Sequence, residues 1–254
     1  MGLGAGWGHQ LLRTGTPRYR LLNWTFSRGD VGADSLWDGA GARRSKLWSR
    51  SGTSAGPRAS RASRAGTHCA TSRDHVGYES WLERDQLILM DRDPQVVEVA
   101  SQPFWLHWHD GTRRRRHAPD YFVRLGDGRG RVVDVRADDR VDEAAAESFE
   151  AMELACRAVG WEFVRAGTPD PVFMANVRWL ARYRRRRCLR WLIAARLLEA
   201  FEEPAPLLEG VRAAGDRLVV LPVLFHLMWS GVLAADLRGE LLHDHSIVWK
   251  DRSR

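Results

Sequence analysis

Lysine is nearly absent from this chain of 254 residues, in which 37 of the 39 Lys and Arg residues are arginine. The two lysines, Lys46 and Lys250, lie far apart in the sequence. A preference that extends along the whole chain indicates the coding bias of a GC-rich genome rather than selection at single positions. Arginine is therefore expected where a related protein has lysine, functional positions included.

Cysteine and long apolar runs are scarce as well. The three cysteines, Cys69, Cys156 and Cys188, form no CxxC pair, which excludes a disulfide framework and a zinc ribbon and fits a reducing cytoplasm. No apolar run of about eighteen residues occurs, so a membrane span is not expected. Residues 1–10 lack the basic and apolar stretches of a secretory signal. We therefore expect a cytoplasmic protein.

The positive net charge of +7 is unevenly distributed. Residues 1–78 hold 12 Lys and Arg against 4 Asp, a balance of +8, whereas residues 79–254 hold 27 against 28 acids, a balance of −1. The basic excess thus lies in the N-terminal third. A high isoelectric point therefore predicts no nucleic-acid binding by the rest of the chain, and only local patches can support it.

Composition divides the chain into three parts. Residues 1–77 are rich in Gly, Arg, Ser and Ala without sustained periodicity, which predicts a mostly disordered extension. Translation from a start codon placed too far upstream would explain it, and a basic arm on nucleic acid is the alternative. Residues 78–167 have the patterns of a folded α/β domain. Residues 168–254 are mostly helical in pattern and predict a second, small domain.

Hydrophobic patterns in the middle part predict one helix, several strands, a second helix and a last strand. Residues 79–91 and 139–159 have helical periodicity, and Gly160 ends the second helix. The predicted strands are 96–100, 104–108, 120–125, 131–136 and 162–165, with a hairpin turn at Asp110–Gly111. The order of helix, antiparallel strands, helix and strand predicts an α/β sandwich around one small sheet.

The last part predicts short helices followed by a β element. Helical patterns cover 172–183, 184–201, 207–214 and 218–230, followed by a turn with a short helix at 231–238 and a strand or hairpin end at 241–249. This order suggests a winged-helix module.

Three acids and one cation form the constellation that could carry chemistry. Glu83 lies in the first helix, Asp120 follows Pro119 at the start of a strand, and Asp134 and Arg136 share one face of the next strand. Carboxylates brought close together repel one another unless a cation joins them. Hard oxygen ligands suit Mg²⁺, or Mn²⁺ in its place, and such a metal activates water against a phosphodiester. In the alternative interpretation, Asp120 and Asp134 are surface acids near turns.

Four segments carry a resemblance to a known family. They are YESWLERD (78–85), DPQVVEVASQPF (93–104), HAPDYFV (117–123) and RVVDVRADDR (131–140). In this order they resemble the nuclease domain of TnsA-like subunits of heteromeric transposases, which belong to the PD-(D/E)xK superfamily, over roughly 79–166. The resemblance implies a restriction-endonuclease-like core. It also implies that Glu83, Asp120 and Asp134 bind metal and that Arg136 stands in the catalytic lysine position. Glu79, one helical turn from Glu83, competes for the helix role.

Two positions depart from the family pattern. Asp134 is one methylene shorter than the usual Glu, and Arg136 replaces lysine. Arginine cannot act as a base, but it can stabilise phosphate charge. The scarcity of lysine favours a tolerated replacement, and a degenerate or partner-dependent site is the alternative.

The resemblance implies a function and partners. The chain would be the Mg²⁺-dependent endonuclease subunit that nicks DNA at transposon ends, with water as the nucleophile. Its partners would be a transposase subunit that cuts the opposite strand and an ATP-using regulator. The alternatives are a catalytically degenerate DNA-binding or adaptor subunit and a stand-alone restriction-like or repair-like nuclease.

Two runs of arginine predict contacts with DNA. The first directly precedes the HAPD segment and is either a phosphate clamp or a solvated hairpin edge. The second lies in a stretch without acids, next to Trp179 and Tyr183, and is either a DNA patch or a solvated helix surface. The residues predicted to bind DNA are Arg113, Arg114, Arg115, Arg116, Arg182, Arg184, Arg185 and Arg186.

Overall fold

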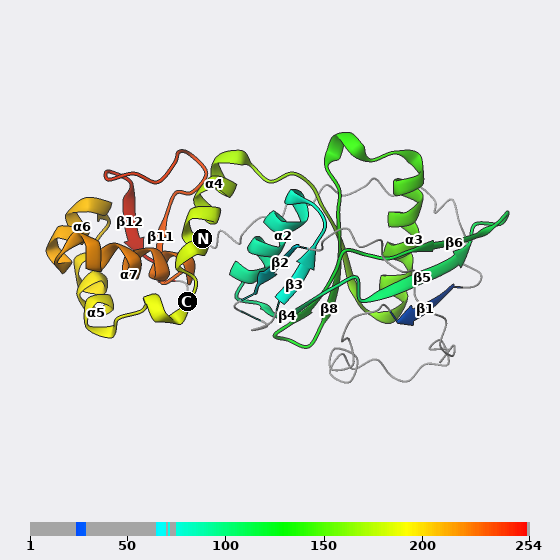
Figure 1. Ribbon diagram of the computed structural model, residues 1–254, viewed down its shortest axis with the longest axis horizontal. Helices are drawn as coiled ribbons and strands as arrows, with labels where there is room; N and C mark the ends of the chain where they lie inside the picture. The colour runs from blue at the N-terminus through cyan, green and yellow to red at the C-terminus, as the bar shows by residue number, and fades with distance from the viewer. Residues whose placement is uncertain (1–23, 29–64, 70, 72–74, 253–254) are drawn as a thin grey trace.

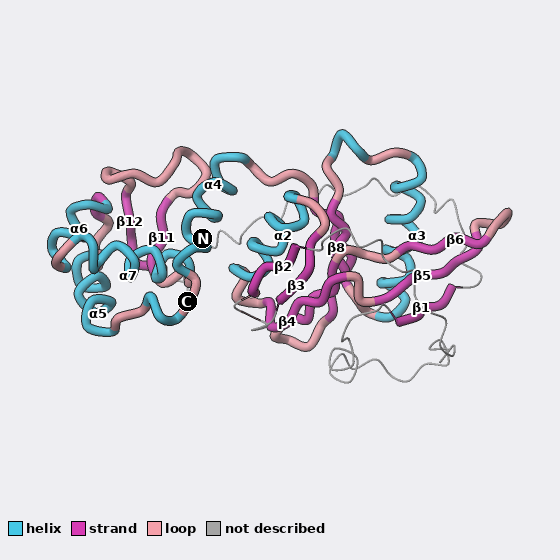
Figure 2. The backbone as a smooth tube through the Cα atoms, in the orientation of Figure 1, coloured by secondary structure: helices cyan, strands magenta, loops and turns pink. Residues whose placement is uncertain are grey.

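The computed structural model describes residues 24–28, 65–69, 71 and 75–252. Figure 1 shows two lobes, one built on β-sheets and one mostly helical, and Figure 2 shows how strands gather in the first and helices in the second. Helix α4 (Pro171–Leu180) is the first helix of the helical lobe. No described helix is both long and apolar enough to cross a membrane.

The main sheet has four strands in the order β4-β7-β8-β9. Strands β4 (Val96–Ser101), β7 (Tyr121–Leu125) and β8 (Gly130–Val135) pair antiparallel, and β9 (Glu162–Ala166) pairs parallel with β8. A parallel pair needs a crossover connection, which α3 (Glu143–Val159) supplies. The predicted α/β class is confirmed, and the last strand of the sheet is parallel to its neighbour.

Helices cover both faces of this sheet. On one face, Leu87 and Met90 of α2 (Trp81–Arg92) pack against buried residues of β4, β7 and β8. On the other, Met152 and Ala155 of α3 pack against Phe122, Val132 and their neighbours. Side chains alternate between the faces of a strand, so each strand serves both cores.

The expected single sheet is wrong, because the hairpin of β5 (Phe104–His109) and β6 (Arg114–His117) belongs to a separate sheet. Its third strand is β1 (Trp24–Arg28), in the order β1-β5-β6. The chain leaves β4 at Gln102, whose φ of 44° is left-handed, and this turns β5 out of the main sheet. Alternating residues of β5 then pack against α3.

Short strands also occur in the segment for which the sequence predicts no regular elements. Strand β2 (Ala65–His68) forms a hairpin with β3 (His75–Tyr78), and β1 pairs with β5. The predicted disordered extension otherwise falls on residues outside the described ranges.

The helical lobe surrounds its own core, which includes Leu180, Leu197, Phe201 and Leu224. Its elements are α4, α5 (Trp191–Ala200), β10 (Ala205–Pro206), α6 (Leu207–Ala214), α7 (Arg217–Trp229), β11 (Leu233–Ala235) and β12 (Ile247–Lys250). The three strands form a small sheet in the order β10-β12-β11.

Two predictions for this lobe are wrong. The helix expected over 184–201 begins only at Trp191, and short 3-10 turns precede it at Ala181–Tyr183 and Arg186–Cys188. Successive arginines without acids one turn away repel each other, which disfavours a regular helix there. The short helix expected within 231–238 is strand β11, because Gly231 turns the chain with a φ of 71° and β12 offers a partner.

Helix α2 belongs to both lobes. Ile88 and Leu89 pack against the core of the helical lobe, whereas Leu87 and Met90 belong to the core beside the sheet. The carboxylate of Asp85 on α2 accepts two hydrogen bonds from the guanidinium of Arg178 on α4. One helix thus fixes both lobes against each other.

Candidate functional site

Asp120 and Asp134 face each other across neighbouring strands. Tyr121 pairs with Val133 in the antiparallel ladder of β7 and β8. Continuing this register by one residue places Asp120 directly opposite Asp134, where side chains share a face. The sequence prediction that these two acids lie side by side agrees with this register.

Asp134 is buried and held by a histidine. The residue is only 2 % exposed, and both of its carboxylate oxygens lie 2.9 Å from Nε2 of His117 at the end of β6. The edge of the His117 ring contacts Phe149 of α3. Burial lowers the pKa of His117, but the hydrogen bond to Asp134 and the charges of Asp134 and Asp120 outweigh it, so the pKa is raised above its ordinary value.

Asp120 carries negative charge that its surroundings only partly compensate. Its Oδ2 accepts a hydrogen bond of 2.7 Å from the backbone N–H of Val135. Burial, followed by the charges of Asp134 and Glu83, nevertheless raises the pKa of Asp120 to about 7. A cation at this position would favour the ionised carboxylate.

Glu83 lies at the start of α2 and caps its own helix. The hydroxyl of Ser80 accepts from the backbone N–H of Glu83 and donates to Glu83 Oε1, at 3.1 and 2.8 Å. Glu83 Oε2 accepts from the backbone N–H of Glu79 at 2.8 Å. This arrangement is a variant of the capping box. Glu83 is also the helix acid whose charge raises the pKa of Asp120, which favours it over Glu79 for the helix role.

Glu79 is held at the corner between the two sheets. Its Oε1 accepts a hydrogen bond of 3.0 Å from the side-chain amide of Gln102. The backbone N–H of Gln102 donates to the carbonyl oxygen of Asp120 at 2.9 Å. The left-handed Gln102 therefore joins Glu79 to the strand that carries Asp120.

Arg136 follows the end of β8 and is exposed to solvent. Its backbone N–H donates to the carbonyl oxygen of Ala166 at 3.0 Å. Its charge lowers the pKa of His117, so the guanidinium acts on the same cluster. A permanently charged group at this position can stabilise a phosphate but cannot accept a proton.

The donor chemistry fits Mg²⁺, although the three acids do not form a ready-made cage. Among the described residues, no group of three or more His, Cys, Asp or Glu side chains is arranged to hold a metal ion. Instead Asp134 is paired with His117, Asp120 with a backbone N–H and Glu83 with its helix end. Asp120 and Asp134 remain a facing pair of hard-oxygen donors, the kind of ligand that this cation prefers. Glu83 would join them only by leaving its cap.

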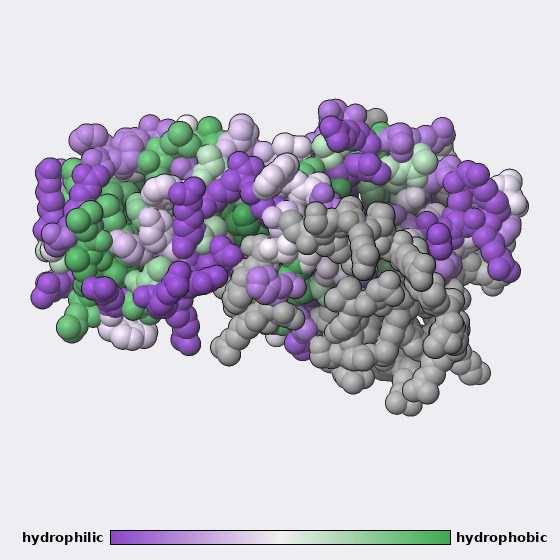
Figure 3. Space-filling model, in the orientation of Figure 1, coloured by the Kyte–Doolittle hydropathy of each residue, from purple (hydrophilic) through white to green (hydrophobic). Residues whose placement is uncertain are grey.

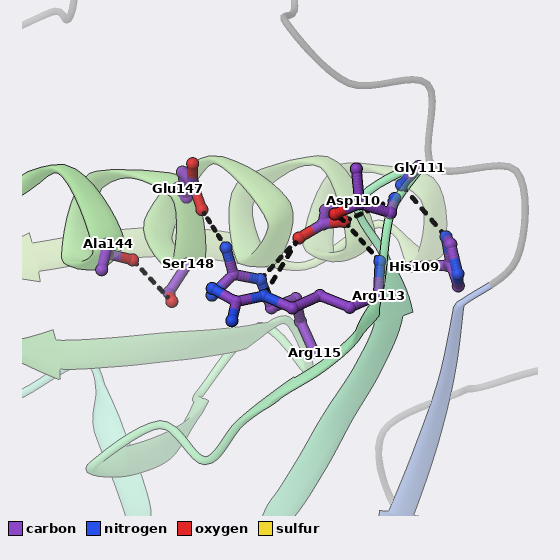
Figure 4. A network of polar contacts seen from close by, with 9 residues as sticks. His109, Asp110, Gly111, Arg113, Arg115, Ala144, Glu147 and Ser148 are labelled. Carbon is purple, nitrogen blue, oxygen red and sulfur yellow. Dashed lines mark hydrogen bonds and ion pairs between the residues drawn. The ribbon is translucent and has the colours of Figure 1, made fainter.

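The first arginine run is divided by the alternation of β6. Arg115 faces α3, and its guanidinium donates hydrogen bonds to Asp110 Oδ2 at 2.6 Å and to Glu147 Oε2 at 3.1 Å (Figure 4). Arg114 and Arg116 point outward and are exposed, and Arg116 lies over the ring of Trp105 at 4.9 Å. Arg115 therefore ties the hairpin to α3, and the outward pair is better placed to contact DNA.

Asp110 organises the tip of the same hairpin. It accepts hydrogen bonds from the backbone N–H groups of Thr112 and Arg113. The hydroxyl of Thr112, these two backbone N–H groups and the side chain of Arg115 all donate hydrogen bonds to Asp110. They hold the pKa of Asp110 well below its usual range. Arg113 also lies 3.8 Å from this carboxylate.

The second arginine run is divided as well. Arg184 turns inward, where its Nε lies 3.4 Å from Asp91 of α2 and its Nη1 donates to the carbonyl oxygen of Ala181. Arg182 is exposed and lies over the ring of Trp179 at 5.0 Å. Arg185 and Arg186 are exposed. Arg184 therefore stabilises the fold, and the others remain candidates for DNA.

His117 is the residue that sequence reasoning missed. It stands three residues before Asp120 in the HAPD segment, and this short spacing was the available signal. The site thus combines two facing carboxylates, a histidine and an exposed arginine, a set suited to binding a cation and a phosphate. No known family model matches the chain, and no curated protein matches its sequence.

Proposed function

We propose that the chain is a Mg²⁺-dependent DNA endonuclease subunit of a TnsA-like heteromeric transposase that nicks DNA at transposon ends. The observation that carries the proposal is the pair Asp120 and Asp134, opposed on adjacent strands, with the pKa of Asp120 raised to about 7 by burial and neighbouring acids. A bound cation would offset the negative charge that these facing acids bring together, and this supports the proposal.

The order of elements supports the restriction-endonuclease-like part of the proposal. Helix α2, antiparallel β4, β7 and β8, helix α3 and the last strand β9 follow the order that the family resemblance implies, and the β5–β6 hairpin lies between β4 and β7. In the helical lobe, α5, α6 and α7 followed by the paired strands β11 and β12 support a winged-helix interpretation.

The residues of the site divide the work of hydrolysis. Asp120 and Asp134 would hold Mg²⁺, which when bound lowers the pKa of water and neutralises charge on the scissile phosphate. His117 fixes the orientation of the Asp134 carboxylate. The backbone N–H of Val135 orients Asp120, and Arg136 stabilises negative charge that develops on the phosphate.

Partners complete the proposed function. By the resemblance, a transposase subunit cuts the opposite strand and an ATP-using regulator controls assembly. Three free thiols, Cys69, Cys156 and Cys188, support a cytoplasmic location.

Nicking of a plasmid that carries the transposon ends tests the proposal. The wild-type chain, assembled with a transposase subunit and an ATP-using regulator of the proposed kind, should nick the plasmid with Mg²⁺ and not with EDTA. Asp120→Asn should reduce nicking to background. Asp127→Asn is the matched control, because Asp127 is an exposed acid in the turn at the far end of the same two strands. Equal nicking by Asp120→Asn and wild type would refute the enzymatic role.

A catalytically degenerate adaptor is the second candidate. It is favoured by Arg136 in the lysine position and by the protein donors that already occupy all three acids. An adaptor would bind DNA and its partners without nicking under any divalent cation.

A further inference from the structure

An excess of positive charge lies at the connection between α4 and α5. Residues 171–198 contain eight arginines and no acid. Two of these arginines are neutralised by acids of α2, since Arg178 pairs with Asp85 and Arg184 with Asp91. The charge that remains is concentrated in and beside the 3-10 turns between the two helices.

The conformation of this connection turns its arginines outward. Arg185, Arg186, Arg187 and Arg190 are exposed, and none of them forms an ion pair with any other residue that the structure describes. Neighbouring like charges raise the free energy of the surface that carries them. A polyanion bound here would remove that cost.

Two large apolar side chains project from the same place. Trp191 and Leu192, in the first turn of α5, are 76 % and 81 % exposed. Toward α4, the guanidinium of Arg182 lies over the ring of Trp179. Figure 3 shows hydrophilic surface across the α4–α5 connection and hydrophobic surface toward the α5–α6 end of the helical lobe. Exposed apolar side chains beside arginines are the combination by which proteins hold phosphates and wedge base steps.

We propose that Arg185, Arg186, Arg187, Arg190, Trp191 and Leu192, here called the α4–α5 ridge, dock duplex DNA. This surface is separate from Glu83, Asp120 and Asp134, here called the acid site. The arginines neutralise backbone phosphates, and Trp191 and Leu192 insert into a groove. Duplex DNA is favoured over an acidic protein because it presents a negative charge about every 1.7 Å along its axis, a density that matches clustered arginines. This inference rests on the proposed function only in taking DNA as the ligand. It does not require that the chain hydrolyse DNA.

Salt-dependent binding tests the arginines of the ridge. The full-length chain with Asp120→Asn, which removes cleavage, is titrated against a fluorescent duplex of a transposon end over a range of NaCl concentrations. Adding Arg186→Ala with Arg187→Ala should weaken binding at low salt by about tenfold or more and reduce the slope of log Kd against log salt by about two. The matched control is Arg196→Ala with Arg212→Ala, which removes the same charge from exposed positions on α5 and α6. If the two double variants changed the Kd and its salt dependence equally, the proposal that the ridge docks DNA would be overturned.

A duplex that contains 2-aminopurine tests the wedge. Binding of the parent chain should raise its fluorescence, because insertion unstacks the base. Trp191→Ala with Leu192→Ala should lose this increase, whereas Leu218→Ala, at another exposed apolar position, should keep it. If the ridge variants bind DNA normally but lose the transposase partner, the surface docks protein and the proposal is overturned. If the ridge binds as expected and the wild type never nicks, only the nuclease assignment fails.

Discussion

The acid site and the α4–α5 ridge both concentrate charge of one sign, but the protein places them in opposite environments. The acids lie on strands or at helix ends. Asp134 is buried, and burial raises the pKa of Asp120. The arginines lie on an irregular connection in full contact with water, which screens their repulsion. Charge of the first kind weakens the folded state strongly, whereas charge of the second kind, screened by water, weakens it only slightly. Both are suited to a partner of opposite sign.

The largest effect is expected at the buried site. Asp120→Asn should increase the free energy of unfolding by about 2–4 kcal/mol near pH 8 without divalent cations. The folded pKa, about 7, lies above the unfolded value of 3.8. The penalty of ionising Asp120 is therefore absent below the unfolded pKa, grows as pH rises and is complete above the folded pKa. Urea unfolding near pH 5 and pH 8 measures it.

A control for this prediction is Asp127→Asn. Hydrogen bonds from Arg129 lower the pKa of Asp127, so the replacement should not stabilise the fold at either pH. If Asp120→Asn were no more stable than wild type near pH 8, ionised Asp120 would not destabilise the folded state. The acid site and the ridge would then not differ in their effect on stability.

The next effect concerns an arginine that leaves the ridge and turns inward. Arg184→Ala should lower the free energy of unfolding by about 2 kcal/mol, because it removes the guanidinium beside the buried carboxylate of Asp91. Its side chain is only 18 % exposed. Arg185→Ala is the control and should change stability by less than about 0.5 kcal/mol. Equal losses in urea unfolding would show that the inward and outward arginines do not differ.

A smaller effect is expected at His117. His117→Ala should lower the free energy of unfolding by about 1 kcal/mol, since it removes the hydrogen bond to Asp134. The folded pKa of His117 is raised, so this stabilisation is fully present below the unfolded pKa and decreases as pH rises through the folded value. Unfolding near pH 6 and pH 9 measures the trend. A greater loss at high pH than at low pH would contradict it.

The smallest effect is expected on the ridge itself. Arg186→Ala with Arg187→Ala should change the free energy of unfolding by at most about 0.5 kcal/mol, because exposed charges interact weakly through water. Any gain in stability at low salt should vanish at high salt. Thermal unfolding at two salt concentrations checks both points. A loss of several degrees would mean that these arginines stabilise the fold, against the assignment of the ridge.

Local patterns explain what could be predicted from the sequence. The spacing between Asp120 and Asp134 leaves room for one strand, a turn and the return strand, and that is how β7 and β8 are built. Ser80 and Glu83 also have the spacing of a capping box, so the helix-capping contacts of Glu83 are predictable from the sequence as well.

The rest depends on contacts between distant segments. His117 meets Asp134 only because a hairpin inserted between β4 and β7 folds back toward β8. Gln102 precedes a proline, which favours extended backbone, so its left-handed conformation could not be expected. Arg184 and Arg185 are equivalent in sequence, and only the position of α2 decides which one turns inward.

Helix α2 also sets a distance. Glu83 lies in its first turn beside the acid site, and Asp91, near its end, meets the connection that carries the ridge. The helical rise over the eight residues from Glu83 to Asp91 is ~12 Å, and duplex DNA advances about 3.4 Å per base pair, so this separation corresponds to roughly three to four base pairs. In the proposed complex, a duplex held by the ridge and the acid site together would thus be contacted at two places about a third of a helical turn apart. The separation of these two contacts would then be fixed by a rigid helix rather than by a flexible linker.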